Sequence, residues 1–305
     1  METLGKFLTL IIAIAFAGCG SRDYEKGYKA YLKKDYATAV KIWRPIAEKG
    51  DVRAQDMMGD VYYYGNGENK DYSEALKWYI RAAEKGYSLS QFAVGLMYDN
   101  GNGVTQNYSS ARRWYMAAAK QGHVAAQNNL GLLLWQGKGG VEHDEEAKEW
   151  FAKAAAKGNA RAQYNLGSMY FQGYGEQDYE KARNLFRRSA ENGFSLAQED
   201  LAVMYDDGKV IPQDHSEAVY WYKKAAAQGM GKSQYNLALL YEQGKGVDSN
   251  LISAYIWFDM AIYKEVPDAL RRRSQITQLL SQSDLKRAME MAAECKTTQF
   301  KNCGK

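Results

Sequence analysis

Apolar residues follow two helical patterns that alternate along most of the chain. In the first pattern, Ala54, Met58, Val61 and Tyr62 fall at i, i+4, i+7 and i+8, which places them on one face of a helix. In the second pattern, residues 74–86, apolar residues recur at i, i+3, i+4 and i+7. Because both faces are apolar, we expect the two helices to pack together as an antiparallel hairpin.

The hairpin recurs with a period of 36 residues. Equivalent alanines of the second helix stand 36 residues apart, with one step of 35, at Ala39, Ala75, Ala111, Ala147, Ala182, Ala218 and Ala254. A fixed period of this size is typical of a solenoid, in which each unit buries its apolar face only by stacking on the next. We therefore predict an all-α, right-handed solenoid of stacked antiparallel helix hairpins.

The pattern also predicts the domain organisation. Residues 51–261 are expected to form six repeats, and residues 19–50 to cap the N-terminal end because only a half-unit is recognised there. After residue 261 the pattern is lost. Residues 262–305 are expected to form capping helices, one starting at Pro267 and another at Ser283-Asp284-Leu285-Lys286.

Glycine stands in the middle of the first helix in four repeats, and alanine replaces it in the next two. The positions are Gly59, Gly95, Gly131, Gly167, Ala202 and Ala238. A mid-helix glycine costs about 1 kcal/mol relative to alanine. We expect that close approach to the alanines of the second helix explains this repeated cost.

Polar residues at the junctions are typical of helix caps. Glycines after each first helix favour the left-handed backbone that ends a helix. Candidate N-caps of the second helices are Asp71, Asn107, Asp178, Asp214 and Asn250. The spacings from Asp71 to Glu74 and from Asp214 to Glu217 match capping boxes.

These features combine into the motif A-Q-x-x-L-G-x-x-Y-x-x-G-x-G-V, followed by D-Y-x-x-A-x-x-W-Y-x-x-A-A-x-x-G. The motif resembles the Sel-one-like repeat, a relative of the tetratricopeptide repeat, over roughly residues 24 to 261. This resemblance implies a non-enzymatic scaffold that binds other proteins through a groove.

The first residues predict export from the cytoplasm. The apolar run from Phe7 to Ala17 is too short to span a bilayer and is typical of a signal peptide, which we place at residues 1–18. Phe16-Ala17-Gly18-Cys19 is similar to a bacterial lipobox, whereas Ala15-Phe16-Ala17 fits ordinary signal peptidase. The two readings predict a lipid-anchored protein and a soluble periplasmic or secreted one, respectively.

The cysteine count favours lipidation. Cys295 and Cys303 stand close together near the C-terminus, as expected for a disulfide in an exported protein, which leaves Cys19 as the odd thiol. Lipidation would account for it. Resemblance to bacterial lipoproteins, with Gly20 after the cysteine, implies an outer-membrane lipoprotein facing the periplasm.

Charge and composition argue against other classes of function. The net charge is +4 and is interspersed along predicted helices, so we predict no nucleic-acid partner. His123, His143 and His215 fall in three different repeats, which argues against a shared metal site or catalytic triad. We expect no metal and no small-molecule cofactor.

One enzymatic alternative stays open. Ser283 and Lys286 have the S-x-x-K spacing of serine β-lactamases, and some relatives of this repeat family carry that label. However, the companion S-D-N and K-T-G motifs are missing. A second alternative is a surface lipoprotein that binds host proteins.

The predicted binding residues follow from the register of the first helices. If these helices line the concave side, ten positions face the groove: Tyr63, Phe92, Asp99, Asn128, Trp135, Tyr164, Phe171, Glu199, Asp206 and Tyr235. Aromatic rings beside polar groups are typical of binding hot spots. The competing interpretation is that the rings only pack between adjacent first helices. We thus expect a protein or peptide partner in the bacterial cell envelope.

Overall fold

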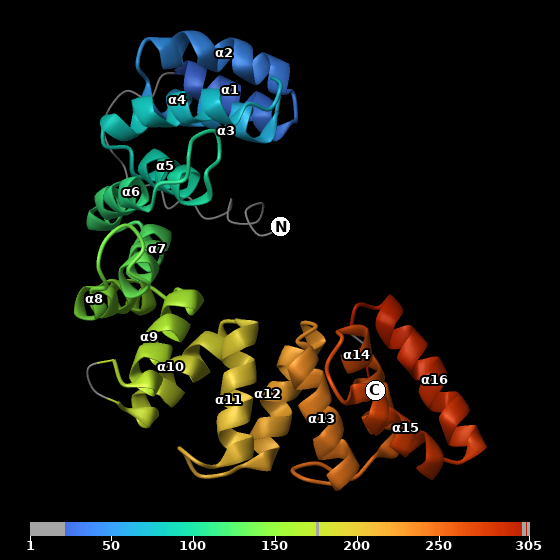
Figure 1. The fold of residues 1–305 in the computed structure, drawn as a ribbon. Helices are drawn as coiled ribbons and strands as arrows, with labels where there is room; N and C mark the ends of the chain where they lie inside the picture. The colour runs from blue at the N-terminus through green and yellow to red at the C-terminus, as the bar shows by residue number, and fades with distance from the viewer. Residues whose placement is uncertain (1–21, 175–176, 301–302, 304–305) are drawn as a thin grey trace. The chain divides into compact units, whose positions relative to one another are not determined.

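The computed structural model describes residues 22–174, 177–300 and 303, and all regular structure within them is helical (Figure 1). The predicted signal peptide and Cys19 lie outside the described residues. The chain divides into two compact units, residues 1–107 and 108–305. Within the described part of the chain, none of the helices has the length and apolar character needed to cross a bilayer.

Unit 1 is a stack of helices in which each packs on the next along the chain. Its helices are α1 (Arg22–Leu32), α2 (Tyr36–Glu48), α3 (Val52–Tyr64), α4 (Tyr72–Glu84) and α5 (Ser88–Asn100). The hairpin of α3 and α4 is the first complete repeat that the sequence predicts.

Unit 2 continues the same alternation of first and second helices and ends with two further helices. Its helices are α6 (Tyr108–Lys120), α7 (Val124–Trp135), α8 (Asp144–Ala156), α9 (Ala160–Gln172), α10 (Tyr179–Glu191), α11 (Ser195–Asp207), α12 (His215–Ala227), α13 (Gly231–Gln243), α14 (Leu251–Tyr263), α15 (Ala269–Leu279) and α16 (Gln282–Thr297). The prediction of an all-α stack of helix hairpins is confirmed.

The alanine of each second helix lies at the centre of its hairpin. All seven equivalent alanines, from Ala39 to Ala254, are fully buried. Alanine has the smallest side chain that still favours a helix, so the facing helix approaches closely at this point. The periodic alanines therefore mark the core of every repeat.

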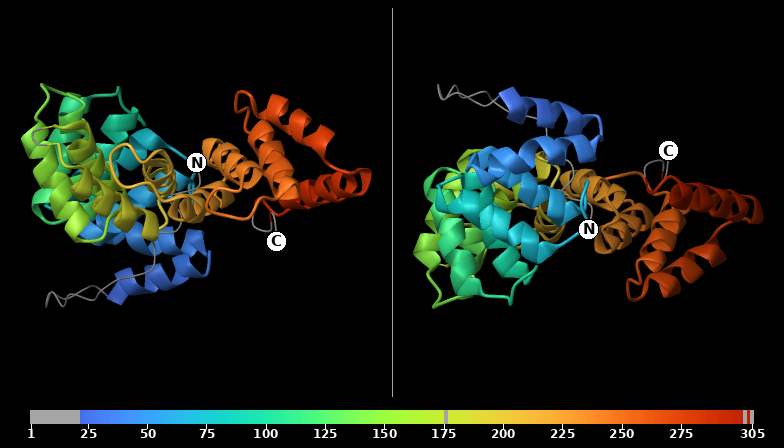
Figure 2. Two further views of the ribbon diagram at one scale, coloured as in Figure 1. Left: turned by 90° about the horizontal axis from the view of Figure 1, so that it is seen from below. Right: turned by 90° about the horizontal axis from the view of Figure 1, so that it is seen from above.

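The last second helix, α14, is covered on more sides than the others. Residues 253–261 are all buried, because α13, α15 and α16 pack around α14, as both ribbon views show (Figure 1, Figure 2). A helix that is apolar all round needs such cover. Its buried Asp259 is paired with Arg273 and with Lys296, whose Nζ lies 2.7 Å from Oδ2. The α15 and α16 pair thus closes the apolar end of the stack.

A buried glutamine connects each first helix to the second helix before it. Its Nε2 donates to a backbone carbonyl eight residues earlier at 2.9–3.2 Å, in the pairs Gln55 to Ala47, Gln91 to Ala83, Gln127 to Ala119, Gln163 to Ala155, Gln198 to Ala190 and Gln234 to Ala226. All six side chains are buried. The glutamine of the repeat motif therefore connects successive helices through a buried hydrogen bond.

The predicted N-caps are confirmed where a side-chain cap is present. Asp71, Asp178, Asp214 and Asn250 each accept a backbone N–H from the first turn of their helix. Half of each predicted capping box is formed, because the side chains of Asp71 and Asp214 accept the N–H groups of Glu74 and Glu217. The reciprocal half is not, since the N–H groups of Asp71 and Asp214 donate to carbonyls of the preceding helix. The expected helix starts at Pro267 and Ser283 are wrong. The helices begin at Ala269 and Gln282, and Ser281 caps the second of them.

The mid-helix glycines are tightly packed, mainly against an aromatic ring and, at Gly131, also against the backbone of the core alanine that the sequence suggested. A Cβ built on Gly131 would lie 2.8 Å from Cε1 of Phe151 and 3.2 Å from the carbonyl oxygen of Ala147. A Cβ on Gly167 would lie 2.9 Å from Cδ1 of Phe186. The main neighbour is thus an aromatic ring four residues after the core alanine, and the alanine contributes backbone rather than side chain.

We predict that Gly131→Ala lowers the free energy of unfolding. The gain of about 1 kcal/mol in helix propensity is offset by about 1 to 3 kcal/mol of overpacking against the Phe151 ring. Chemical denaturation measures the change. Ala202→Gly is the matched control, since a methyl group is already accommodated there, and its loss should also cost about 1 kcal/mol. A Gly131→Ala protein more stable than the parent would contradict the packing account.

Candidate functional site

Three positions per repeat lie in register on the first helices, and we call them the A face. They are Asp56, Phe92, Asn128, Tyr164, Glu199 and Tyr235; Asp60, Leu96, Leu132, Ser168, Val203 and Leu239; and Tyr63, Asp99, Trp135, Phe171, Asp206 and Glu242. The set contains six acidic residues and no Lys or Arg. The A face is therefore acidic although the whole chain carries a net charge of +4. It is described below for each unit separately.

The aromatic residues of the A face in unit 2 pack against second helices. The Trp135 ring meets the edges of Phe151 and Tyr174, with ring centres 6.1 and 5.6 Å apart. The Phe171 ring contacts Tyr179 at 5.5 Å. Similar contacts join Tyr164 to Phe186 and Phe194, and Tyr235 to Phe258. All four A-face rings are half-buried, so each contributes to packing and keeps part of its surface accessible.

Side-chain hydrogen bonds connect adjacent first helices across the A face of unit 2. Asn165 Nδ2 donates to Asn128 Oδ1 at 3.0 Å, which joins α9 to α7. Tyr164 Oη donates to Asp200 Oδ2 at 2.9 Å, which joins α9 to α11. These contacts lie beside the packed rings. They fix the spacing of the first helices and so the spacing of groups that a partner would meet.

The same connection continues between α11 and α13. Ser233 Oγ donates to Glu199 Oε2 at 2.7 Å, and Asp206 Oδ1 lies 3.0 Å from His215 Nδ1. Burial raises the pKa of Asp200, and the neighbouring Glu199 charge adds to this effect. The acidic groups here are held by neutral donors or by histidine rather than by Lys or Arg. Their negative potential is therefore available to a cation.

Unit 1 contains a pair of carboxyl groups one helical turn apart on α3. Asp56 accepts from Ser90 Oγ, and Asp60 accepts from Tyr79 Oη, both at 2.6 Å. Burial and then the Asp60 charge raise the pKa of Asp56 to about 8. Burial raises the pKa of Asp60 to about 6. At neutral pH the pair thus retains a proton that two exposed aspartates would lose.

Tyrosines and one arginine surround this pair. The Arg53 guanidinium lies 4.1 Å from the centre of the Tyr24 ring. Burial, and then the Asp56 charge, raise the pKa of Tyr87 to about 12. Burial, and then the Asp60 charge, raise the pKa of Tyr64 to about 12. The described surroundings of the pair are therefore rich in aromatic rings, and the Arg53 guanidinium lies over one of these rings.

The residues predicted for unit 1 lie on the same face, but the pair itself was missed. Tyr63 contacts Tyr72 at 5.0 Å between ring centres and accepts a hydrogen bond from Asn102 at 3.3 Å. Phe92 and Asp99 are half-buried. Asp56 occupies the repeat position of Phe92, so the register that selected Phe92 also pointed to Asp56.

The candidate catalytic groups do not form a site. His123 is the N-cap of α7, where its Nδ1 accepts the N–H of Ala126, and burial lowers its pKa to about 4. Ser283 and Lys286 are both exposed in the first turn of α16, and Ser283 Oγ lies 2.9 Å from Ser281 Oγ. No cluster of three or more metal-ligating side chains occurs among the described residues.

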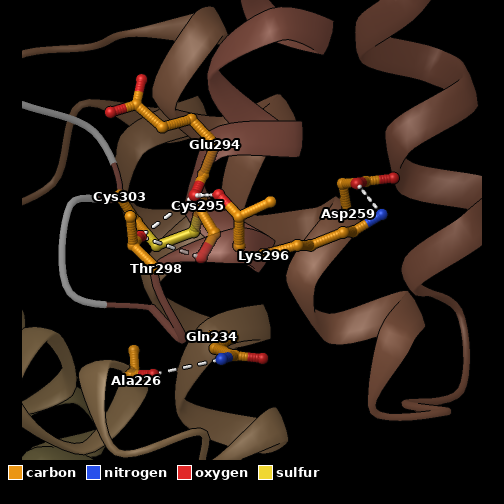
Figure 3. The surroundings of a disulfide bond; sticks show 9 residues. Ala226, Gln234, Asp259, Glu294, Cys295, Lys296, Thr298 and Cys303 are labelled. Carbon is orange, nitrogen blue, oxygen red and sulfur yellow. Dashed lines mark hydrogen bonds and ion pairs between the residues drawn. A yellow bond between two sulfur atoms is a disulfide. The ribbon is translucent and has the colours of Figure 1, made fainter.

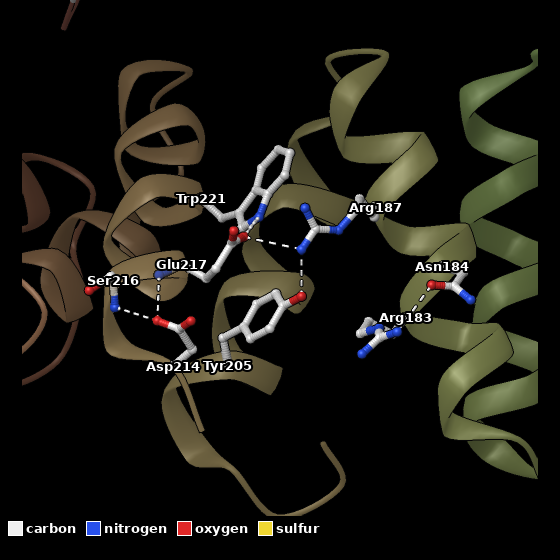
Figure 4. A network of polar contacts seen from close by, with 8 residues as sticks. All are labelled: Arg183, Asn184, Arg187, Tyr205, Asp214, Ser216, Glu217 and Trp221. Carbon is white, nitrogen blue, oxygen red and sulfur yellow. Dashed lines mark hydrogen bonds and ion pairs between the residues drawn. The ribbon is translucent and has the colours of Figure 1, made fainter. Parts of the chain in front are cut away.

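A polar network on the side of the second helices has a structural role. Arg187 of α10 donates to Tyr205 Oη of α11 at 2.5 Å and lies 3.2 Å from Glu217 of α12 (Figure 4). Glu217 also accepts the indole N–H of Trp221 at 3.0 Å. These groups satisfy one another across three helices. We therefore interpret the network as a structural contact between repeats rather than as a binding site.

Comparison with known proteins agrees with this arrangement. The Sel1 repeat, which is the Sel-one-like repeat, matches residues 13–51, 52–87, 88–123, 124–159, 160–194, 195–230 and 231–265. The chain belongs to the Sel1 repeat family. The seven matched segments include residues 13–51, part of which we expected to form a cap. No curated protein matches the chain significantly.

Two solved structures resemble the chain over most of its length. A Sel1 repeat protein from Oxalobacter formigenes is 32% identical with a TM-score of 0.70, and the match covers 79% of this chain and 97% of that one. A protective antigen present in uropathogenic Escherichia coli strains, which displays the same fold, is 25% identical with a TM-score of 0.58. That match covers 92% of this chain and 76% of the antigen.

We predict that the acidic pair makes stability fall as pH rises. Asp56 is protonated in the folded state up to about pH 8 but ionises near pH 3.8 when unfolded, so folding is penalised between these values. Asp56→Asn keeps an acceptor for Ser90 without the charge. It should raise the thermal unfolding midpoint at pH 8 and have less effect at pH 5.

Circular dichroism melts at both pH values measure this difference. The exposed Asp248 provides the matched control, because Asp248→Asn removes the same charge outside the pair. An Asp56→Asn protein whose midpoint changes with pH as much as that of the parent would show that the pair does not carry the penalty.

Proposed function

We propose that this protein binds a protein or peptide partner through the A face, in the bacterial cell envelope and without catalysing a reaction. The observation that carries the proposal is the A face of unit 2, where half-buried rings stand among acidic groups and no A-face position holds Lys or Arg, although Glu242 is paired with Arg272 at 3.5 Å. Sel1 repeat proteins are protein-interaction scaffolds, and their fold is typically non-catalytic. A face of this kind supports binding without any reacting group.

The chemistry of the face favours a partner segment with basic and apolar residues. Carboxylates held by neutral donors attract Lys or Arg, and accessible ring surface accepts apolar side chains. Electrostatic complementarity of this kind increases the association rate and selects among partners. We therefore expect binding to weaken at high salt.

The cellular setting follows from the N-terminal sequence. Lipidation of Cys19 would place the repeats beside the outer membrane, where the stack displays its A face to envelope proteins. Similarity to the protective antigen of uropathogenic E. coli supports a variant of the proposal in which the A face binds a host protein. Protease treatment of intact cells distinguishes the variants, since only a surface-exposed protein is cleaved.

We predict that a photo-crosslinking residue at Val203 captures the partner in living cells. Val203 is an A-face position of α11 and is 41% exposed. Tyr220, on the second helix α12, is 51% exposed and serves as the matched control. A discrete adduct from position 203 that is missing from position 220 supports the A face. Adducts of equal yield from both positions would argue against it.

The acidic groups are tested by neutral variants on the same helix. Glu199→Gln keeps an acceptor for Ser233, and Asp207→Asn removes a charge from an exposed residue at the C-terminal end of the same helix. The crosslink at position 203 should weaken in Glu199→Gln and persist in Asp207→Asn. Equal melting points of both variants separate loss of binding from loss of folding.

We also predict that Cys19→Ser releases the protein from the membrane fraction. Stable anchoring depends on acyl chains, each buried CH₂ of which contributes about 0.8 kcal/mol. Mass spectrometry of the mature N-terminus provides the direct readout, with a lipid-modified cysteine expected for the parent. Cleavage after Ala17 with an unmodified Cys19 would instead establish the soluble alternative.

A further inference from the structure

A second candidate site lies at the C-terminal end of unit 2, where helices α12, α14 and α16 end close together. It is a pocket of about 430 Å³ lined by Ala227, Gln228, Tyr263, Lys264, Lys296, Gln299 and Phe300. The lining has two ammonium groups, two amides and two aromatic rings, and no acidic residue. It does not include any A-face position, so it is independent of the function proposed above.

Lys264 makes different contacts from its equivalents in earlier repeats. In several repeats the residue that follows the second helix donates to the carbonyl of the glycine one repeat before, as Lys157 does to Gly122 at 3.0 Å and Gln228 to Gly193 at 3.1 Å. Asn192 already departs from this series, because its Nδ2 donates to Gln163 Oε1. Lys264 occupies the next position in this series. Its Nζ lies instead over the rings of Tyr263 and Phe300, 5.6 and 5.3 Å from their centres.

Phe300 lies close to the glycine that corresponds to Gly122 and Gly193 in this series. A Cβ built on Gly229, the glycine that Lys264 would be expected to reach, would lie 3.2 Å from the Phe300 ring. The Phe300 ring thus shares the space beside Gly229 with Lys264, whose Cε would lie 3.5 Å from the same Cβ, and the Lys264 ammonium group lies over the ring at the pocket. Cation–π contacts of this length leave the three N–H groups of a lysine available to an acceptor.

The segment that carries Phe300 is held in an unusual backbone conformation. Gln299 and Phe300 have φ angles of 51° and 68°, which non-glycine residues rarely adopt and which cost about 1 kcal/mol or more each. The disulfide between Cys295 and Cys303 closes this segment back onto α16 (Figure 3). Strained backbone that is cross-linked in place is typical of a functional segment.

The second ammonium group is positioned by a buried carboxylate. Lys296 Nζ lies 2.7 Å from Asp259 Oδ2 (Figure 3). Asp259 also contacts Arg273. One carboxylate thus faces two cations, which leaves an excess of positive charge near the pocket. An anion that enters would be attracted by Lys264 directly and by this excess.

We propose that the pocket binds the carboxylate of a peptide, with an adjacent apolar side chain against Phe300 and Tyr263. Ammonium and amide donors match a carboxylate, and the volume suits one or two residues. The carboxylate comes from a chain terminus or from an Asp or Glu side chain. Both sources present the same acceptor oxygens, and the experiment below separates them.

The test titrates three short peptides into the protein with its disulfide intact. N-acetyl-alanyl-phenylalanine offers a terminal carboxylate, its amide has none, and N-acetyl-glutamyl-phenylalanine amide offers a side-chain carboxylate. Backbone NMR signals of Lys264 and Phe300 report binding. We expect one or both carboxylates, but not the neutral amide, to move these signals. The peptide that binds more tightly identifies whether the carboxylate comes from a chain terminus or from a side chain.

Variants assign the effect to the pocket. Lys264 is exposed, and Lys264→Gln should weaken carboxylate binding about tenfold, the loss expected for one charge-assisted hydrogen bond. Lys286→Gln removes an exposed charge elsewhere on α16 and should leave affinity unchanged. Phe300→Ala should weaken binding of the phenylalanine-containing peptides. The melting point of this variant shows whether it remains folded.

Three results would overturn the proposal. These are no shift of the Lys264 and Phe300 signals with any peptide, equal weakening by Lys286→Gln and Lys264→Gln, and tighter binding of inorganic phosphate than of either carboxylate. The last result would identify a phosphate site in place of a peptide site.

Discussion

The arrangement of repeats depends on one buried contact, the hydrogen bond from a glutamine amide to the last turn of the preceding helix. The carbonyl of Ala155 accepts both the N–H of Gly158 and the Nε2 of Gln163, so both of its lone pairs are used. Leaving the buried amide N–H unpaired would be costly, so this bond favours a placement of the next helix that keeps it. The bond therefore helps to set where each first helix starts relative to the hairpin before it.

Because this junction and the alanine core are internal, the outer positions of the first helices vary in residue type, although several of them also bond to the adjacent first helix. Position 56 and its equivalents hold aspartate, phenylalanine, asparagine, tyrosine and glutamate within one chain. In unit 1 this variation extends to Asp56 and Asp60, whose raised pKa values show that their charges oppose folding. Stability lost at such a position is commonly retained for function.

The sequence predicted the repeating elements but not the side-chain contacts that each repeat makes. Periodicity identified the hairpins, the buried alanines and caps such as Asp71, because these depend on local spacing. It missed the main neighbour of Gly131, since the ring of Phe151, four residues after Ala147, reaches further than the alanine, and a period does not encode side-chain reach. The pocket at Lys264 was beyond prediction, because Phe300 is placed by a disulfide and by two left-handed residues outside the repeat.

Departures from the repeat are thus more informative than the repeat itself. Where Lys157 and Gln228 bind a glycine carbonyl, their side chains are explained by the stack. Lys264 holds the equivalent position, but its ammonium group lies over the Phe300 ring beside Gly229, so the stack alone does not explain its contacts. Unit 2 therefore has a basic pocket at the end of the array and an acidic A face along its first helices. Two sites of opposite charge favour different segments of a partner, which makes binding at one separable from binding at the other.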